Sequence, residues 1–150
     1  MEQKKIDAFF GDYRFLSNFH IAPVRYNGLY YPSSEAAYQA AKCRTEEERK
    51  AFCNYSPSEA KYYGQMVKLR PDWEDVKEQV MEDIVRAKFT QNQYLGDWLL
   101  NTGDAELIEG NNWGDTTWGV DIRTKKGKNL LGKILMKVRA ELKEKEVERK

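Results

Sequence analysis

Apolar residues recur along the chain at helical spacing in some segments and as short runs in others. Spacings of three and four residues predict two long helices, over 72–91 and from Asn129 to about 142. Shorter helices are predicted over 35–42, after Thr45, over 57–64 and over 94–100. Short strands are predicted at 6–10, 21–26, 29–31 and 105–109. The predicted fold class is therefore α+β, a compact, helix-rich single domain with a few short strands.

Turn and cap residues fix where several of these elements begin and end. Asn27-Gly28 between two apolar runs favours a type I′ hairpin turn, in which both central residues need positive φ. Ser33-Ser34 can cap the helix over 35–42. Capping boxes are predicted at Thr45 with Glu48 and at Ser56 with Glu59. Gly64 is expected to end the helix over 57–64.

The chain shows no internal repeat and no low-complexity linker, which indicates one domain over 1–150. We expect its core to span about 6–142 and its last residues, 143–150, to form a charged, solvated helix end. No apolar stretch approaches the length of a membrane span, and Met1–Lys5 lacks the apolar part of a signal peptide. A cytoplasmic protein with no membrane partner is expected.

Composition excludes several classes of protein. The 25 Lys and Arg nearly balance the 24 Asp and Glu, so a net charge of +1 gives no general attraction to nucleic acid or anionic membranes. With His20 as the single histidine, a Ser-His-Asp triad or a multi-histidine zinc site has little to work with. Cys43 and Cys53 lie ten residues apart and are interpreted as reduced, small apolar residues. We expect no metal and no cofactor.

Two early segments combine polar and aromatic residues in a way that suits a ligand. Ser17-Asn18-Phe19 suits a flat, hydrogen-bonding ligand, although, taken alone, the segment favours an Asx or Ser turn with core aromatics. Further on, four polar side chains share one helix face opposite small alanines: Glu35, Tyr38, Gln39 and Lys42. On the alternative interpretation, Glu35 is a surface carboxylate that favours the helix dipole.

Two later segments carry further candidates. Lys88 projects from the apolar arc of the long helix, where it must snorkel, pair with a carboxylate or meet a ligand anion; the sequence alone favours snorkelling. Trp113 and Trp118 lie in a loop with Asp115 and Gly119, a composition typical of a stacking platform. The run 125–129 before the last helix is a candidate phosphate site at helical N–H groups.

Seven blocks in chain order resemble the NADAR (YbiA-like) family, from Phe9 to about Leu142. The blocks are Leu16-Ser-Asn-Phe19, Pro32-Ser-x-Glu35-x-x-Tyr38-Gln39-x-x-Lys42, Trp73-x-x-Val76-Lys77-x-x-Val80-Met81, Arg86-Ala-Lys88-Phe89-x-Gln91-Asn92, Leu99-Leu-x-Thr-Gly103, Trp118-Gly119 and Lys126-Gly-x-Asn129-x-Leu131-Gly132-x-x-Leu135-Met136. The resemblance implies the family's compact α+β fold and hydrolysis of an N-glycosidic bond. The implied substrates are ribosylamino-pyrimidine phosphates of riboflavin synthesis, or ADP-ribose carried on guanine in DNA.

The resemblance also implies site residues at Glu35, Trp73, Asp115 and Trp118. Ala36 replaces a histidine common in the family, so proton transfer by that histidine has no counterpart here. Asp121 replaces a common glycine in the late loop.

Breaking a C1′–N bond puts positive charge on the ribose and requires a proton on the leaving base. We expect Glu35 to act on the water side and Asp115 on the base side. The other predicted site residues bind substrate: Ser17, Asn18, Phe19, Tyr38, Gln39, Lys42, Trp73, Lys88, Trp113, Trp118, Gly119 and Asn129.

Two other classes of function use the same residues differently. A non-catalytic ADP-ribose or nucleotide-binding module would use the same aromatic residues without turnover. A scaffold would bind a protein partner through the lysine-rich C-terminus and would leave the Trp118 loop unexplained. The near-zero net charge mildly favours a small ribosylated nucleotide over ADP-ribosylated DNA as substrate. The sequence carries no signal for an oligomeric state.

Overall fold

A computed structural model of the chain describes residues 4–149, so the first three residues and Lys150 lie outside the described part. The predicted helix-rich α+β class is confirmed. The helices are α1 (Ser34–Ala41), α2 (Glu46–Ala51), α3 (Pro57–Gly64), α4 (Trp73–Gln91), α5 (Gln93–Asn101) and α6 (Leu130–Glu148), with 3₁₀ turns η1 (Gly11–Leu16) and η2 (Phe52–Asn54). The strands are β1 (Lys5–Ile6), β2 (Ile21–Tyr26), β3 (Leu29–Ser33), β4 (Glu106–Leu107), β5 (Gly110–Asn111) and β6 (Val120–Asp121). Among the described helices, none is long and apolar enough to cross a membrane.

The chain divides into two compact units. Residues 18–92 form one unit, which we call the hairpin unit, and the described residues of 1–17 and 93–150 form the other, the α5–α6 unit. Each is described by itself below. That the chain folds as one domain stays a prediction.

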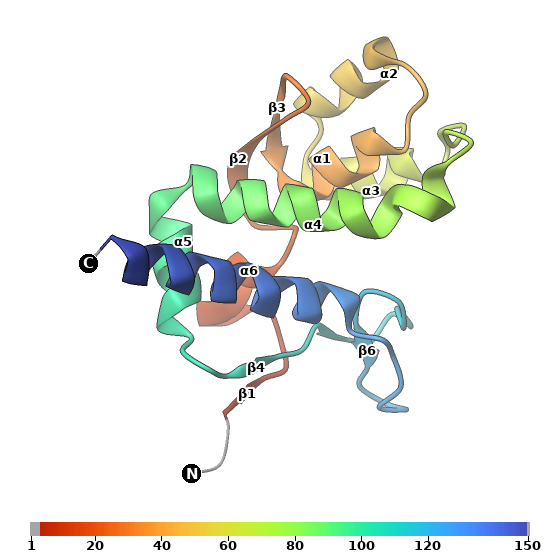
Figure 1. The fold of residues 1–150 in the computed structure, drawn as a ribbon. Coiled ribbons are helices and arrows are strands. Elements are labelled where there is room, and N and C mark those ends of the chain that lie inside the picture. Colours follow the sequence, from red (N-terminus) through yellow and green to blue (C-terminus); the bar gives the residue numbers. More distant parts are fainter. Residues whose placement is uncertain (1–3, 150) are drawn as a thin grey trace. The chain divides into compact units, whose positions relative to one another are not determined.

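In the hairpin unit, β2 and β3 form the predicted antiparallel hairpin (Figure 1). Asn27 and Gly28 both have positive φ, 51° and 83°, as a type I′ turn requires. Ser33 ends β3 and caps α1, because its side chain accepts a hydrogen bond from the Ala36 N–H. The hairpin therefore delivers the chain directly into the first turn of α1.

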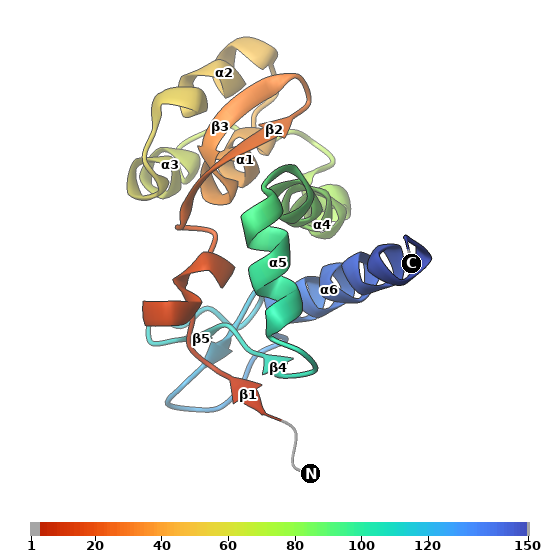
Figure 2. The ribbon, with the colours of Figure 1, turned by 90° about the vertical axis from the view of Figure 1, so that its left-hand side faces the viewer.

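Helix α1 is buried on every side within this unit. It contacts β2, β3, α3 and α4, and Figure 2 shows it behind the hairpin with α3 and α4 on either side. Its alanines have almost no exposed surface, which lets these elements approach closely: Ala36, Ala37, Ala40 and Ala41. The polar face of α1 is therefore enclosed by protein rather than solvated.

The caps of the next helices follow the sequence with one exception. Ser56 and Glu59 form a complete capping box at α3. At α2, Thr45 accepts from the Glu48 N–H, but the Glu48 carboxylate accepts from the Thr45 hydroxyl rather than from backbone. Helix α4 begins at Trp73 and ends at Gln91, within a residue of the prediction.

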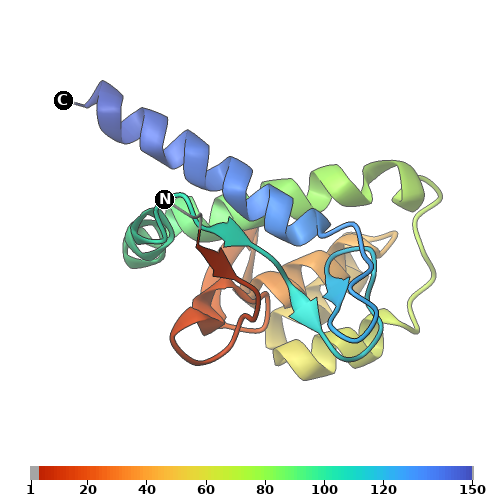
Figure 3. The same cartoon turned by 90° about the horizontal axis from the view of Figure 1, so that it is seen from below.

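In the α5–α6 unit the two predicted strands are shorter than expected. Strand β1 has two residues because its parallel partner β4 has two, and the chain after it forms η1. Strand β4 stops at Leu107 because the Gly110 N–H turns back to the Ile108 carbonyl. Strand β5 lies in the segment from Gly110 to Gly119 that we interpret from sequence as a loop, and its parallel partner β6 follows that segment directly (Figure 3).

Candidate functional site

Glu35 lies in the first turn of α1 and is only 8% exposed. The interpretation of Glu35 as a surface dipole residue is therefore wrong. Its backbone N–H donates to the Asn18 carbonyl at 3.1 Å, which fixes the start of the helix. Because an ionised carboxylate is costly to bury without partners, the groups around it decide what it can do.

Two side chains on the same helix face Glu35. Gln39, one turn later and 6% exposed, donates from Nε2 to Glu35 Oε2 at 2.6 Å. Lys42 is half-buried; burial lowers its pKa, and the negative charge of Glu35 opposes that shift. The predicted face thus forms one electrostatic group around a buried carboxylate.

Tyr38 and Trp73 form the aromatic wall of this group. Their ring centroids lie 5.3 Å apart in a tilted arrangement, and Lys42 Nζ lies 5.7 Å from the Tyr38 centroid. Trp73 is 4% exposed and begins α4, so the structure places it in the hairpin unit's core beside Tyr38. We call Glu35, Tyr38, Gln39, Lys42 and Trp73 the Glu35 cluster.

Asn18 ties the start of α1 to α4. Its side-chain Oδ1 accepts from the Ser34 hydroxyl at 2.9 Å, and its Nδ2 donates to Met81 Sδ at 3.4 Å. Its carbonyl also accepts from Ser34 and Glu35. Next to it, Phe19 lies under Lys61, with Nζ 5.9 Å from the ring centroid. Asn18 therefore supports the helix that carries Glu35, and a direct role with substrate stays a prediction.

Lys88 does not snorkel. Its side chain is 1% exposed, and burial lowers its pKa to about 7. The other residues on this face of α4 are equally enclosed: Met81, Ile84, Val85 and Phe89. The interpretation favoured by sequence is wrong because this face of α4 is buried, and the Lys88 side chain with it.

In the α5–α6 unit, Asp115 organises the Trp-containing loop. Its Oδ1 accepts from the backbone N–H groups of Thr117 and Trp118, each at 2.9 Å. The buried side chain of Asn111 makes two hydrogen bonds with the backbone of Asp115. Its Oδ1 accepts from the Asp115 N–H and its Nδ2 donates to the Asp115 carbonyl. One carboxylate oxygen is thus committed to the loop, and the other has no hydrogen bond within the described residues.

Asn129 and Gly119 join this loop to α6. Asn129 Oδ1 accepts from the Glu109 N–H and Nδ2 donates to the Leu107 carbonyl, both at 2.9 Å. A Cβ on Gly119 would overlap the Glu109 carbonyl and carboxylate, so only glycine permits this approach. Both residues have packing roles here, and their contact with substrate stays a prediction.

The candidate phosphate site before α6 is not supported. The N–H groups of Asn129, Leu130 and Leu131 donate to the carbonyls of residues 119, 117 and 118. Because these donors are already used, the start of α6 does not offer them to an anion. These N–H groups therefore do not form the predicted phosphate site. The lysines in the run 125–129 are exposed.

The two loop tryptophans differ in burial. Trp113 is 61% exposed, whereas Trp118 is half-buried and its backbone N–H donates to the Asp115 carboxylate. Ser17 lies at the end of η1, where its N–H donates to the Arg14 carbonyl. Asp115, Trp118, Gly119 and Asn129 are thus brought together in the α5–α6 unit, as the Glu35 cluster and Asn18 are in the hairpin unit.

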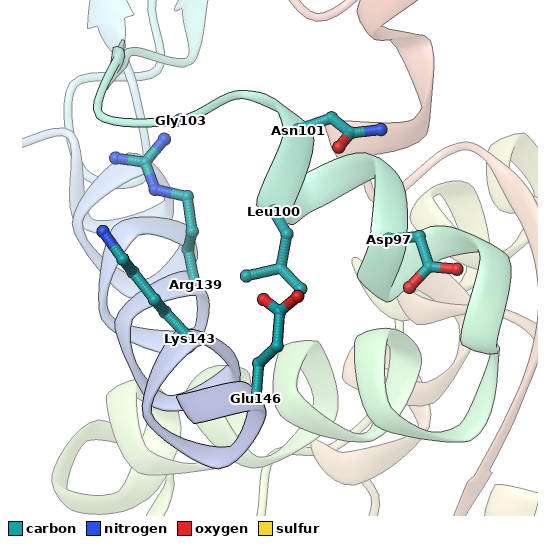
Figure 4. Close-up of a pocket in the computed structure, with 7 residues that line it drawn as sticks. All are labelled: Asp97, Leu100, Asn101, Gly103, Arg139, Lys143 and Glu146. Carbon is teal, nitrogen blue, oxygen red and sulfur yellow. The ribbon is translucent and has the colours of Figure 1, made fainter. Parts of the chain in front are cut away.

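A cavity of about 300 Å³ lies between α5 and α6 (Figure 4). Its lining contains no predicted site residue: Asp97, Leu100, Asn101, Gly103, Arg139, Lys143 and Glu146. Arg139 donates hydrogen bonds from its guanidinium to the Thr102 hydroxyl and to the Ala105 carbonyl. Its guanidinium therefore stabilises the turn after α5.

Residues able to bind a metal are not gathered in the part of the chain that the structure describes. The two cysteines are free, as predicted. Burial raises the pKa of Cys43 to about 11, so this thiol is protonated at neutral pH and is a poor nucleophile.

Two residues that shape the candidate site were missed from sequence. Gly64 was expected only to end α3, yet its backbone is not left-handed, and its place is explained by close packing on Gln39. Asn111 was counted only as part of a polar loop, although it is 2% exposed and holds residues 111–115 together. In the sequence, the available signals were a glycine at the end of a predicted helix for Gly64 and an amide side chain in a Gly-rich loop for Asn111.

Comparison with known proteins connects this geometry to a family. The NADAR domain matches residues 5–143. The chain belongs to the NADAR domain family. It is 41% identical to "N-glycosidase YbiA" of Escherichia coli over 134 residues, which is 87% of this chain and 82% of that protein. It is 35% identical to "N-glycosidase Npun_R5314" of Nostoc punctiforme over 136 residues, 87% of this chain and 86% of that one.

Two further matches concern pathway and fold. The chain is 41% identical over 140 residues to "Riboflavin biosynthesis protein VVA0006" of Vibrio vulnificus, covering 87% of this chain and 36% of that protein. The NMR structure of E. coli YbiA superposes with a TM-score of 0.86 at 38% identity, covering 99% of this chain and 90% of that one. Membership of the NADAR family and a YbiA-like fold are thus confirmed, and the relatives' names support glycosidase activity in general.

Proposed function

We propose that this NADAR protein is an N-glycosidase that hydrolyses the C1′–N bond of a ribosylated, phosphate-bearing base. The observation that carries the proposal is the buried Glu35 carboxylate, held at 2.6 Å by Gln39 and accompanied by the half-buried Lys42. Relatives named N-glycosidase support the reaction class. A carboxylate in this setting suits the cationic character of a breaking glycosidic bond.

Glu35 orients the attacking water and stabilises the positive charge that develops on the ribose. As the C1′–N bond breaks, its electron pair goes to the leaving nitrogen, which takes up a proton. Water adds to C1′ and loses a proton. The products are the phosphate-bearing ribose, now with a hydroxyl on C1′, and the base. Asp115 is the proposed group on the base side, through the oxygen that the loop does not use. Lys42 offers a positive charge to the substrate phosphate.

Two substrate classes fit this chemistry: a ribosylamino-pyrimidine phosphate and ADP-ribose on guanine of DNA. The first is favoured by the name of the Vibrio vulnificus relative and by the net charge of +1. A non-catalytic ADP-ribose or nucleotide-binding module is the competing function. It predicts saturable binding of ADP-ribose without release of base.

Incubating the purified protein with each substrate, and following release of ribose phosphate or ADP-ribose, tests the proposal. We expect turnover of at least one substrate, unchanged by EDTA, because no step requires a metal ion. Binding without product release from either substrate would favour the non-catalytic module. Loss of turnover in EDTA with recovery on adding a divalent ion would contradict the metal-free mechanism.

Glu35→Gln is the variant that tests the assignment. We expect a native fold and a loss of about 100-fold or more in rate, the scale of a general acid–base group. Glu47→Gln is the matched control, because Glu47 occupies the same position in the first turn of α2 but is exposed. Wild-type turnover in Glu35→Gln would remove Glu35 from the mechanism.

A further inference from the structure

The buried amide of Gln39 has a hydrogen bond at only one of its two ends. Nε2 donates to Glu35 Oε2 at 2.6 Å, one helical turn away on α1. Oε1 is the only buried side-chain oxygen or nitrogen without a hydrogen-bond partner among the described residues. An amide with 6% exposure in this state is unusual, because a buried acceptor ordinarily finds a donor.

Gly64 on α3 explains what faces that oxygen. A Cβ added to Gly64 would overlap Gln39 Oε1 and lie only 2.7 Å from Gln39 Cδ. The Cα–H that takes the place of the Cβ therefore points at Oε1, the geometry of a weak C–H···O contact. Gly64 does not have positive φ, so its backbone does not require glycine, whereas the space beside Gln39 does.

This packing also decides which end of the amide faces Glu35. Turning the amide over would place Oε1 against the Glu35 carboxylate, with two acceptors in contact, and would aim the NH₂ group at a Cα–H. The first change opposes an ionised Glu35, and the second leaves the NH₂ donors without an acceptor at Gly64. The observed orientation, by contrast, gives the charged carboxylate a short hydrogen bond.

We propose that Gln39, held in place by Gly64, is a positioning residue that fixes the Glu35 carboxylate and stabilises its charged form through this hydrogen bond, rather than a residue that binds substrate. The inference rests on the proposed function of Glu35. It reassigns Gln39 from the substrate to the carboxylate, and it gives Gly64 a part in the site that the sequence did not suggest.

Other charged groups near Glu35 are shared by the variants below. Lys42 acts on Glu35 from the same helix and Lys77 acts on Lys42 from α4. The buried Lys88 lies on α4, and Lys61 on α3 stands over Phe19. Because these groups are unchanged in a Gln39 variant, a change in the titration of Glu35 reports the lost amide.

Gln39→Leu removes the donor and keeps the volume. We expect kcat to fall about 10-fold or more with KM within about threefold, and the acidic limb of the kcat/KM profile to move to higher pH. The sign follows because losing a donor to the charged form favours the protonated form. A substrate-binding role predicts the opposite split, a raised KM with an unmoved limb, and would overturn the proposal.

Gln79→Leu is the matched control for this variant. Gln79 donates to the Asp83 carboxylate at 2.9 Å across one turn of α4, but the pair is exposed. We expect its kcat, KM and pH profile to match those of the wild type. A similar loss in Gln79→Leu would show a general effect on the hairpin unit and contradict positioning by Gln39.

Gly64→Ala tests the second half of the proposal in a double-mutant cycle. We expect about a 10-fold fall in kcat in the wild-type background and less than about twofold in Gln39→Ala, where no amide remains to be displaced. Thermal unfolding of each variant separates this from loss of fold. Equal effects in both backgrounds would show that Gly64 acts independently of Gln39.

A measurement without substrate keeps this inference separate from the proposed function. The carboxyl ¹³C signal of Glu35, followed against pH, should titrate at higher pH in Gln39→Leu than in the wild type. Identical titrations would overturn the positioning role even in an active enzyme. A shifted titration in a protein without turnover would sustain it and reject the glycosidase instead.

Discussion

At the scale of single residues, Lys88 has a consequence for stability that can be measured. Burial of its amine lowers its pKa to about 7, from 10.5 for a solvated lysine. In the unfolded chain the same amine keeps its ordinary pKa. Between these two values the unfolded state binds a proton that the folded state does not, so folding is penalised as the pH falls.

Lys88→Met is expected to raise the free energy of unfolding at pH 7 by a few kcal/mol, with about 5 kcal/mol as the ceiling set by the shift. The gain should shrink as pH rises from 7 toward 10.5, where the unfolded lysine is also neutral. Denaturant unfolding of both proteins across this range measures the difference. Taking the difference removes other groups, such as Tyr31, whose pKa burial raises. A gain that does not vary with pH would show that Lys88 is not neutral in the folded protein.

The same scale marks the limit of what could be read from sequence. The spacing of Glu35, Tyr38, Gln39 and Lys42 placed them on one face, and that prediction is confirmed in the sense that they form one cluster. Whether that face met water could not be decided, because alanines pack against solvent-facing and enclosed helices alike. Helix α1, which carries Glu35, packs on α3 and α4, and α4, which carries Lys88, packs on α1 and β2, so this packing joins elements distant along the chain.

At the scale of elements, local chemistry predicted more than tertiary pairing did. The Asn27-Gly28 turn and the Ser56 capping box depend on a few neighbouring residues, and both are confirmed. The strands over 6–10 and 105–109 were too long because the length of a strand depends on its partner. The role of Gly64 was missed for the same reason, since it packs against another helix.

The Asp115 loop allows its structural and chemical roles to be separated. Asp115→Asn keeps an Oδ1 acceptor for the Thr117 and Trp118 N–H groups, whereas Asp115→Ala removes it. We expect the Asn variant to unfold within about 0.5 kcal/mol of the wild type and the Ala variant to lose about 1–2 kcal/mol. We also expect both to lose about 100-fold or more in kcat, because neither retains an ionisable group. Full activity in Asp115→Asn would reduce Asp115 to a loop cap.

Trp118 is expected to bind the base or ribose by stacking. Its half-buried state leaves part of the indole accessible. Trp118→Ala should weaken ADP-ribose binding by about 1–3 kcal/mol, measured by saturable quenching of tryptophan fluorescence or by calorimetry, with an unchanged far-UV circular dichroism spectrum. Trp98→Ala is the matched control in the same unit, since Trp98 is 46% exposed and packs on Phe15 and Tyr94. Unchanged affinity with a stability loss of about 3–5 kcal/mol would place Trp118 in the core instead.

At the scale of the whole molecule, the balance of charge bears on the choice of substrate. The 25 basic and 24 acidic residues leave the chain with a net charge of +1, so no general field draws it to a polyanion. Each predicted phosphate contact must then come from individual side chains, of which Lys42 lies beside Glu35. A substrate with one or two phosphates needs few such contacts, whereas a DNA strand needs many.

Salt dependence therefore distinguishes the two substrate classes. For a ribosylated nucleotide, we expect kcat/KM to fall by less than about 10-fold between about 50 and 200 mM salt, since only one or two counterions are released on binding. A protein that makes about six to ten phosphate contacts with DNA loses about 10³–10⁵ in affinity over the same range. Measuring kcat/KM on both substrates across this range, with unmodified single-stranded DNA as a competitor, decides between them. A steep salt dependence together with inhibition by the competitor would show that local basic side chains outweigh the neutral total, and that ADP-ribosylated DNA is the substrate.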